Sequence, residues 1–417
     1  MLGWLFAAWR PNIRPAPDLR NQLLAMAKST LIAMALDYPL PARGGVGVIV
    51  ESLLRYLAPE YRVLLISPDD PKELEPYFSA SRISEHIRIS QADLTRTTAR
   101  GLADAIIQRG AALAHFHGGG NFTWGTRRGT KSPFPFLGSA NVPVIFSAHQ
   151  IGPLRAMYYP AERQHWFKLA FLPLIMGACT YSLWRTRQVI TDSKHDANML
   201  KRQFPLLAGR INFIYHSRLD ATENVAVTTV GRQKTVLSVG HVAIRKGQHV
   251  LAEAFSRIAS RFPDWKLVIA GPLVEPRCSD WIERIRQEHH LTGRIQLIGS
   301  QPNPRDLMQT AGVFVQPSLM EAFGLALQEA MFLGCACVGS NTGGIPELIV
   351  DNQTGRLCAP GNPDALADAL TDLLGCPEKR QRLGEAAHAD IIQKGMTGQA
   401  MAANYEKIYR RVLPQHR

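Results

Sequence analysis

The chain has 417 residues, which is too long for one ordinary hydrophobic core and predicts two or three domains. With 46% hydrophobic and 19% charged residues and no low-complexity tract, its composition is that of a globular protein and excludes a fibrous or disordered one. Residues 1–220 contain 26 Lys and Arg against 15 Asp and Glu, while residues 221–417 contain 21 against 19, so most of the net charge of +13 lies in the first half.

The chain begins with a short apolar stretch, Met1–Trp9, that ends at Arg10-Pro11. It lacks the positively charged start of a secretory signal, and it is shorter than the ~20 residues that a membrane-spanning helix needs. Its tryptophans beside Arg10 could lie in a membrane interface. We favour a disordered leader, or a start upstream of the native one near Met26, and treat residues 1–30 as an N-terminal extension.

Apolar runs of strand length then alternate with helical patterns through both halves. Continuously apolar runs are typical of strands covered on both faces, and the alternation predicts parallel sheets with right-handed crossovers. Because twelve strands in one open sheet would be unusual, we predict an α/β protein with two doubly wound, Rossmann-like domains that face each other across a cleft. The predicted strands are 31–36, 62–67, 86–90, 112–117, 142–149, 188–191 and 211–215, then 235–239, 265–270, 294–298, 312–316 and 335–339.

The polar stretch 217–234 separates the two series, which predicts domains at 31–216 and 217–395. A helical pattern at 399–413 lies in the last segment, 396–417, which we expect to pack back on the first domain. The most hydrophobic stretch, 166–184, contains Pro173 and Gly177, which argue against a membrane-spanning helix. We expect core or cleft-wall helices there, with docking on a membrane as the alternative.

A glycine-rich loop follows the first predicted strand and opens a helix. Gly44, Gly45 and Gly47 would let the backbone approach a phosphate. The spacing is not the dinucleotide-binding fingerprint, because position 50 is Val rather than the third glycine. With only Asp69 as a loose match for a ribose-binding acid, an NAD(P)-dependent oxidoreductase is a weak alternative.

Three histidines, His115, His117 and His149, stand at the ends of apolar strand runs. Because the carboxyl ends of parallel strands line the cleft, we expect the imidazole of His149 to face it. A lone histidine at a strand end is usually structural, so this position alone assigns no role.

The second half has its own cleft-edge features. Arg245 and Lys246 lie in the loop after the strand at 235–239, where two cations suit a diphosphate, although two surface charges are the bland alternative. Further on, Glu321 stands in a turn, and we expect a helix to begin near Phe323, so that the amides of residues 322–324 face phosphate or sugar oxygens. Glu329 lies eight residues on, about 12 Å along a helix, which suits two polyols of one extended ligand and is too far for a glycosidase pair.

Together these motifs resemble family 4 of the retaining glycosyltransferases, which have the GT-B fold. Glu321-Ala-Phe-Gly with Glu329-Ala-Met resembles the E-x7-E signature, and Gly343-Gly-Ile-Pro-Glu347 resembles the GG-x-P-E element that follows it. The likeness covers about residues 30–413. It implies a nucleotide-diphosphate sugar as donor, retention of anomeric configuration, and no metal or other cofactor. The absence of any Asp-x-Asp triplet in the chain agrees with the last point.

The resemblance also implies roles for individual residues. Glu329 would hold the ribose, Glu321 the donor sugar, and Lys246 the departing diphosphate, while His149 would contact the transferred sugar. The predicted catalytic residues are thus His149, Glu321 and Lys246, and the predicted donor-binding residues are Gly44, Gly45, Gly47, His241, Arg245, Lys246, Ala322, Phe323, Gly324 and Glu329.

One position departs from the family pattern, because Gly240-His241 stands where relatives have Gly-Arg. The arginine that would share the β-phosphate is therefore missing, and we expect Arg245 to replace it. A non-catalytic binding subunit is an alternative motivated by this change, and a nucleotide-sugar epimerase of the same architecture is another.

The charge asymmetry assigns the acceptor to the first half of the chain. We expect an anionic or lipid-linked glycan as acceptor, no nucleic acid, and a role in cell-surface polysaccharide or lipopolysaccharide biosynthesis. Six scattered cysteines without zinc spacing fit a reduced cytosolic interior. The expected location is therefore the cytoplasm, with possible peripheral contact at the inner face of the membrane.

Overall fold

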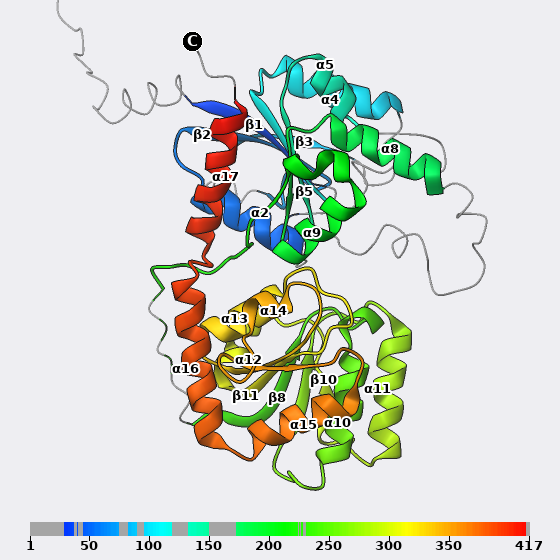
Figure 1. The fold of residues 1–417 in the computed structure, drawn as a ribbon, viewed down its shortest axis with the longest axis vertical. Coiled ribbons are helices and arrows are strands. Elements are labelled where there is room, and N and C mark those ends of the chain that lie inside the picture. The colour runs from blue at the N-terminus through cyan, green and yellow to red at the C-terminus, as the bar shows by residue number, and fades with distance from the viewer. Residues whose placement is uncertain are drawn as a thin grey trace, which may run out of the picture.

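The computed structural model describes residues 29–36, 40, 45–74, 82–89, 96–118, 132–149, 172–223, 225, 227 and 231–413. The described strands form two sheets, one of seven and one of six, and all the paired strands run parallel. In Figure 1 the first sheet and its helices lie in the upper half and the second set lies in the lower half. The expected pair of doubly wound α/β units is confirmed.

The first sheet has the strand order β3-β2-β1-β4-β5-β6-β7, with the order reversing between β1 and β4. β5 is buried along its whole length, as its apolar sequence predicts, whereas the edge strand β3 is largely exposed or half-buried. The strands are β1 (Thr30–Leu36), β2 (Tyr61–Ser67), β3 (Ile83–Arg88), β4 (Leu113–Gly118), β5 (Val144–Ala148), β6 (Gln188–Thr191) and β7 (Ile211–Phe213). The described helices here are α2 (Gly45–Tyr56), α4 (Arg96–Gln108), α5 (Phe134–Ser139), α8 (Leu172–Trp184), α9 (Lys194–Gln203) and the 3-10 helix η2 (Pro205–Arg210).

The second sheet has the order β10-β9-β8-β11-β12-β13, with its reversal between β8 and β11. Its strands are β8 (Gln233–Val239), β9 (Lys266–Ala270), β10 (Ile295–Leu297), β11 (Ala311–Gln316), β12 (Ala336–Ser340) and β13 (Arg356–Cys358). Its helices are η3 (Ile244–Lys246), α10 (Gln248–Ile258), α11 (Pro276–Glu288), α12 (Pro304–Thr310), α13 (Leu325–Phe332), α14 (Ile345–Leu348), α15 (Pro363–Leu374) and α16 (Pro377–Gln393).

The last helix, α17 (Gly398–Val412), returns to the first sheet and packs against α2 (Figure 1). Met401, Tyr405 and Tyr409 recur at helical spacing, and all three are buried in the same cluster as Ile32 and Leu53. The apolar stripe of α17 therefore completes the core on one face of the first sheet. The domain boundaries drawn from the sequence, 31–216, 217–395 and 396–417, stay a prediction.

The chain passes between the two halves at two adjacent points. Asp220 accepts hydrogen bonds from Tyr56 Oη at 2.8 Å and from Gln399 Nε2 at 2.7 Å. A Cβ on Gly398 would lie 2.4 Å from the Tyr56 ring, so only glycine allows this close approach. These contacts tie both crossing segments to α2.

Three local expectations differ from the structure. β13 has only three residues and was not expected from a pattern that needs longer apolar runs. The edge strand β3 begins at Ile83 rather than at residue 86. Half of its residues face solvent, so it lacks the continuous apolar run from which a strand start is predicted. Gly177 lies inside α8 rather than breaking it, while Pro173 occupies its first turn, where proline is tolerated.

Most of the N-terminal extension, residues 1–28, and the part of the hydrophobic stretch before Leu172 lie outside the described residues. Among the helices that are described, none combines the length and the apolar character that crossing a membrane requires.

Candidate functional site

Three loops meet at the carboxyl edge of the second sheet, beside its order reversal. They follow the neighbouring strands β8, β11 and β12, and they carry Lys246, Glu321 and Gly343. Parallel sheets bind ligands at this place, because the loops on either side of the reversal diverge and leave room between them. The three motifs found in the sequence are thus brought together by the topology.

Close backbone approach fixes the first two loops. Gly247 has a left-handed φ of 72°, and a Cβ there would lie 1.9 Å from the carbonyl oxygen of Pro317. The carbonyl of Arg245 accepts the amides of Leu319 at 2.8 Å and Met320 at 3.2 Å. The loop that carries Lys246 is therefore locked against the turn that carries Glu321.

Lys246 and Glu321 form an ion pair at this junction. Lys246 Nζ lies 2.7 Å from Glu321 Oε2, which also accepts Gln316 Nε2 and Ser318 Oγ, both at 2.9 Å. Burial alone would raise the pKa of Glu321, but the charge and hydrogen bond of Lys246 and the Ser318 hydroxyl hold that pKa below its ordinary value. Glu321 is therefore a charged, fixed acceptor, and Lys246 is held where an anionic ligand would meet it.

The helix after Glu321 begins later than expected, which corrects one element of the predicted site. α13 starts at Leu325, because Gly324 takes a left-handed φ of 104° as its N-cap. Ala322, Phe323 and Gly324 therefore precede the helix instead of forming its first turn. The Phe323 side chain is 2% exposed and stacks on Tyr215 at a centroid distance of 5.3 Å, so it anchors the turn.

The third loop packs directly on this turn. A Cβ on Gly343 would lie 1.7 Å from the Glu321 carbonyl oxygen, and one on Gly344 would lie 2.5 Å from the Ala322 carbonyl oxygen. The paired glycines thus allow backbone contact with the Glu321 turn, in addition to any approach to a ligand.

Glu329, the second acid of the signature, is buried in α13 and pairs with Arg218 from the segment after β7. Burial raises the pKa of Glu329, and the charge of Arg218 offsets this only in part. Arg218 was not singled out from the sequence, since a single arginine after a strand carries no pattern. A second contact joins α13 to the segment after β7 that contains Arg218. Gln328, beside Glu329, donates a hydrogen bond to the His216 carbonyl at 3.2 Å.

His241 lies next to the two cations of the first loop. Burial, together with the charges of Arg245 and Lys246, lowers the pKa of His241, so the imidazole is neutral at pH 7. Its carbonyl accepts Gln248 Nε2 at 2.9 Å, while the Arg245 side chain is exposed. Replacement of the missing family arginine by Arg245 stays a prediction.

The first domain presents α2 to this site. Gly45 is the first residue of α2, and a Cβ there would lie 3.8 Å from Leu325 Cδ1 at the start of α13. Gly47 is buried within the helix. Gly44 lies outside the described residues, so the approach of this loop to a donor phosphate stays a prediction.

A carboxylate from the second domain caps α9 of the first. Glu347 accepts the amides of Lys194 at 3.0 Å and His195 at 2.7 Å. Nearby, the Asp196 side chain is buried, and neither carboxyl oxygen has a hydrogen-bond partner among the described residues. Burial and the charges of Asp192, Glu347 and Glu321 raise the pKa of Asp196 to about 9, so this carboxyl is protonated at neutral pH.

His149 lies in a buried hydrogen-bond network beneath the carboxyl edge of the first sheet. Its Nδ1 lies 2.9 Å from Asp192 Oδ1 and its Nε2 lies 3.0 Å from His117 Nδ1, and only 1% of the side chain is exposed. The imidazole does not project freely as expected, so a sugar would reach it only by replacing one of these bonds. Its contact with a sugar stays a prediction.

Asp192 and His216, which the sequence did not single out, join His149 in this network. The three residues offer ligand atoms within 4.8 Å of one another, a spacing that a metal ion could bridge. His149 Nδ1 and Asp192 Oδ1 form a hydrogen bond of 2.9 Å, and His216 Nδ1 lies 3.0 Å from the same oxygen without hydrogen-bond geometry. We interpret the group as part of a buried polar network rather than as a metal site.

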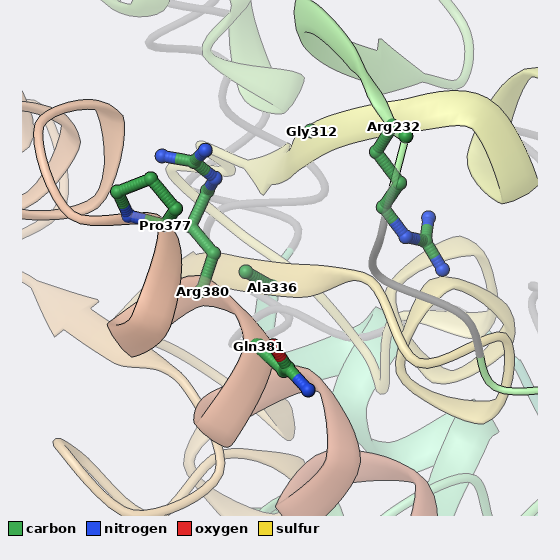
Figure 2. Close-up of a pocket in the computed structure, with 7 residues that line it drawn as sticks. Arg232, Gly312, Ala336, Pro377, Arg380 and Gln381 are labelled. Atoms are coloured by element: carbon green, nitrogen blue, oxygen red, sulfur yellow. The ribbon is translucent and has the colours of Figure 1, made fainter.

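A cavity of about 290 Å³ lies at the opposite, amino edge of the second sheet (Figure 2). Its walls include Arg232, Gly312, Ala336, Pro377 and Arg380. Both guanidinium groups already donate to backbone carbonyls, Arg232 to Met308 at 2.8 Å and Arg380 to Leu373 at 2.6 Å. This cavity is therefore structural and separate from the candidate site.

Comparisons with known proteins match both halves. Residues 43–217 match the family model described as Glycosyltransferase Family 4, and residues 220–390 match the model described as Glycosyl transferases group 1. The chain is 30% identical over 181 residues to an N-acetyl-alpha-D-glucosaminyl L-malate synthase from Bacillus anthracis, covering 43% of this chain and only 46% of that protein. It is 27% identical over 409 residues to an alpha-maltose-1-phosphate synthase from Mycobacterium tuberculosis, covering 90% of this chain and 97% of that protein.

Among solved structures, HepE from Anabaena in complex with UDP and glucose shares the fold. The TM-score is 0.70 at 16% identity, covering 91% of this chain and 99% of that one. The two parallel sheets, the converging loops and the matches to both halves lead to one conclusion: the chain belongs to the family 4 (group 1) glycosyltransferases and has the GT-B fold.

Proposed function

We propose that this protein transfers a sugar from a nucleotide-diphosphate sugar to an acceptor with retention of anomeric configuration. The observation that carries the proposal is the Lys246–Glu321 pair, held at the order reversal of the second sheet by the packing of Gly247 on Pro317. In a nucleotide-diphosphate sugar, the diphosphate is joined directly to the sugar. The fixed cation of Lys246 suits the diphosphate, and the carboxylate of Glu321 beside it suits the sugar hydroxyls.

The donor lies across the second domain in this proposal. Glu329 binds the ribose hydroxyls, Glu321 and the turn at 322–324 bind the sugar, and Lys246 and Arg245 bind the diphosphate. Arg218, now paired with Glu329, keeps this buried acid partly compensated until a ribose arrives. The amino end of α2, beside Leu325, covers the diphosphate from the first domain.

The chemistry is electrostatic. As the sugar–phosphate bond breaks, negative charge grows on the diphosphate, and Lys246 stabilises that charge in a site from which water is largely excluded. Removal of one such group typically costs about 10²- to 10³-fold in rate. The proposal requires no metal.

Retention fits front-face attack assisted by the leaving phosphate, because the carboxylates near the pair are engaged elsewhere. Glu347 is bound by two amides of α9, and Asp196 is buried and protonated. Neither Glu347 nor Asp196 is therefore placed as a free nucleophile for a covalent glycosyl-enzyme intermediate.

The excess of positive charge in residues 1–220 supports an anionic acceptor, such as a phosphorylated or lipid-linked glycan at the inner face of the membrane. The Bacillus anthracis relative is named for L-malate, an anion, which agrees with this direction. Cell-surface polysaccharide assembly in the cytoplasm is the context that we propose. Fully soluble protein after fractionation at low salt would count against the membrane contact.

A donor-binding screen tests the proposal. Unfolding temperature is measured with UDP-, GDP- and ADP-glucose, with EDTA present throughout, for the wild type and for Glu329→Gln. A donor at about 100 times its Kd adds about 2.7 kcal/mol to the stability of the state that binds it. We expect one nucleotide to raise the unfolding temperature of the wild type and to do so less in the variant. No shift with any nucleotide sugar would overturn the proposal, and shifts without release of nucleoside diphosphate would favour the non-catalytic alternative.

A further inference from the structure

The buried network around His149 is larger than the proposed transfer requires. Its residues come from β4, β5, the segments after β6 and β7, and α17, so five separate parts of the chain meet there. All of its members are buried: His115, His117, Ser147, His149, Asp192, His216, Tyr405 and Tyr409.

Asp192 sets the direction of the hydrogen bonds, because a carboxylate only accepts them. Its Oδ1 forms a hydrogen bond of 2.9 Å with His149 Nδ1, so that ring carries a proton on Nδ1. His216 Nδ1 lies 3.0 Å from the same oxygen but outside hydrogen-bond geometry. Two facing lone pairs would repel each other at that distance, so we place the proton of His216 on Nδ1 as well. Burial would raise the pKa of Asp192, but the two histidines hold that pKa below its ordinary value. The carboxylate is therefore charged, and it faces an N–H group of each imidazole.

The remaining bonds on one side then follow in sequence. With a proton on Nδ1, the neutral His216 ring accepts the Tyr405 O–H at Nε2, at 2.7 Å. Tyr405 in turn accepts the Ser147 O–H at 2.9 Å, and Ser147 accepts His115 Nε2–H at 2.8 Å. His115 Nδ1 accepts the Tyr409 O–H at 2.7 Å. Each donor is used once, and every bond points toward the carboxylate.

The other side is shorter. Nε2 of His149 is a bare acceptor and takes the N–H of His117 Nδ1 at 3.0 Å. Burial first, and then the neighbouring histidines, lower the pKa of His117 well below its ordinary value, so this ring is neutral. In the part of the chain that is described, Nε2 of His117 has no hydrogen-bond partner. The two Nε2 atoms at this end of the network are thus both acceptors.

We propose that Asp192 is a positioning residue that holds His149 in the Nδ1–H tautomer, so that its Nε2 accepts a hydrogen bond from a hydroxyl of the transferred sugar, which replaces the N–H of His117. The inference rests on the proposed function, in which His149 contacts that sugar. His216 lies 3.0 Å from Asp192 and is hydrogen-bonded to Tyr405, which connects the C-terminal helix to the site.

The tautomer matters because of the charge that develops on the sugar. The transition state of glycosyl transfer resembles an oxocarbenium ion, which is stabilised by electron density on neighbouring oxygens. An accepting Nε2 draws the hydroxyl proton toward itself and makes that oxygen more negative. An N–H group at the same place would withdraw electron density and disfavour the transition state.

The tautomer can be read directly from the full chain labelled with ¹⁵N-histidine, without a donor, because nitrogens with and without a proton have distinct shifts. His149→Gln assigns the signals. In the wild type we expect a protonated Nδ1 and a bare Nε2 on His149. Asp192→Ala removes the acceptor and should move the proton toward Nε2, whereas Asp192→Asn keeps a carbonyl acceptor and should restore the wild-type tautomer. Asp69→Ala, which removes a buried carboxylate after the end of β2, is the matched control and should leave His149 unchanged.

Kinetics give the functional readout. The donor in these assays is the nucleotide sugar that gives the largest thermal shift. We expect Asp192→Ala to slow release of nucleoside diphosphate from that donor about 10- to 100-fold, the cost of one lost hydrogen bond to a charged group, and Asp192→Asn to recover most of the rate. The Kd of the free nucleoside diphosphate should not change in either variant, because it carries no sugar. Failure of the proposed function is distinguishable: the wild type would show the expected tautomer but neither bind nor cleave any of the UDP-, GDP- and ADP-sugars.

Four results would overturn the inference. They are a proton on Nε2 or on both nitrogens of wild-type His149, an unchanged tautomer in Asp192→Ala, an equal loss of nucleoside-diphosphate affinity and rate in that variant, or a stoichiometric metal ion in the purified wild type. If Asp192→Ala does not fold, the wild-type spectrum still decides the first, and metal analysis of the purified wild type decides the last.

Discussion

Replacing Asp196 by asparagine should stabilise the protein increasingly as the pH rises. The native carboxyl has a pKa of about 9, because it is buried beside three other acids, whereas an unfolded aspartate ionises near its ordinary value of 3.8. Between these values the native state keeps a proton that the unfolded state has lost. The contribution of Asp196 to the free energy of unfolding is therefore fully present at acid pH and decreases as the pH rises.

The size of the effect follows from the same two values. Each pH unit in this window costs the native state about 1.36 kcal/mol, which gives about 3.4 kcal/mol between about pH 5.5 and about pH 8. Ionisation of part of the native population near the upper pH, and rearrangement of nearby water, reduce this to about 2–3 kcal/mol. The amide of the Asp196→Asn variant does not titrate and carries no such penalty, so the stability difference between variant and wild type should grow by that amount.

Urea denaturation of both proteins at about pH 5.5 and about pH 8 measures the difference directly, because all other titrating groups are shared. Asp306→Asn, which also removes an acid from the first turn of a helix, is the control. A difference that is the same at both pH values would refute the reasoning, because it would mean that Asp196 is ionised in the native protein.

Three further outcomes follow from the site. Gly247→Ala should reduce donor affinity more than about tenfold and lower the unfolding temperature, because its Cβ would lie 1.9 Å from the Pro317 carbonyl oxygen; unchanged donor titrations would contradict the loop packing. Glu347→Gln should weaken the cap on α9 and lower the amide protection of the first turn of that helix in hydrogen exchange, and equal protection would count against a contact between the domains in solution. Arg245→Ala should weaken donor binding about tenfold in calorimetric titrations, and unchanged affinity would exclude it as the replacement for the missing family arginine.

Sequence patterns were sufficient for the parallel sheets and for the loops that carry the candidate site. Continuous apolar runs located strands such as β5 and β11 to within a residue or two. Strands that are buried on both faces are apolar at every position, so polar residues do not interrupt the run. Lys246, Glu321 and Glu329 were found because each lies in a local motif. The delayed start of α13 was missed, since Gly324 fits either a first turn or a left-handed cap.

Long-range partners could not be predicted in the same way. Arg218 meets Glu329, and Asp192 meets His149 and His216, only because the fold brings distant segments together. No spacing of residues along the sequence predicts such pairs. The buried state of His149 has the same origin, because a strand end says where a residue lies but not which neighbours occupy its nitrogens.

The central claim is that the Lys246–Glu321 junction binds and activates a nucleotide-diphosphate sugar. Release of nucleoside diphosphate from the nucleotide sugar that gives the largest thermal shift, measured in EDTA for the wild type and for Lys246→Met, tests it most directly. We predict measurable release by the wild type and a decrease in kcat/KM of about 10²- to 10³-fold in the variant. Equal rates for the two proteins, or no release by a well-folded wild type, would contradict it.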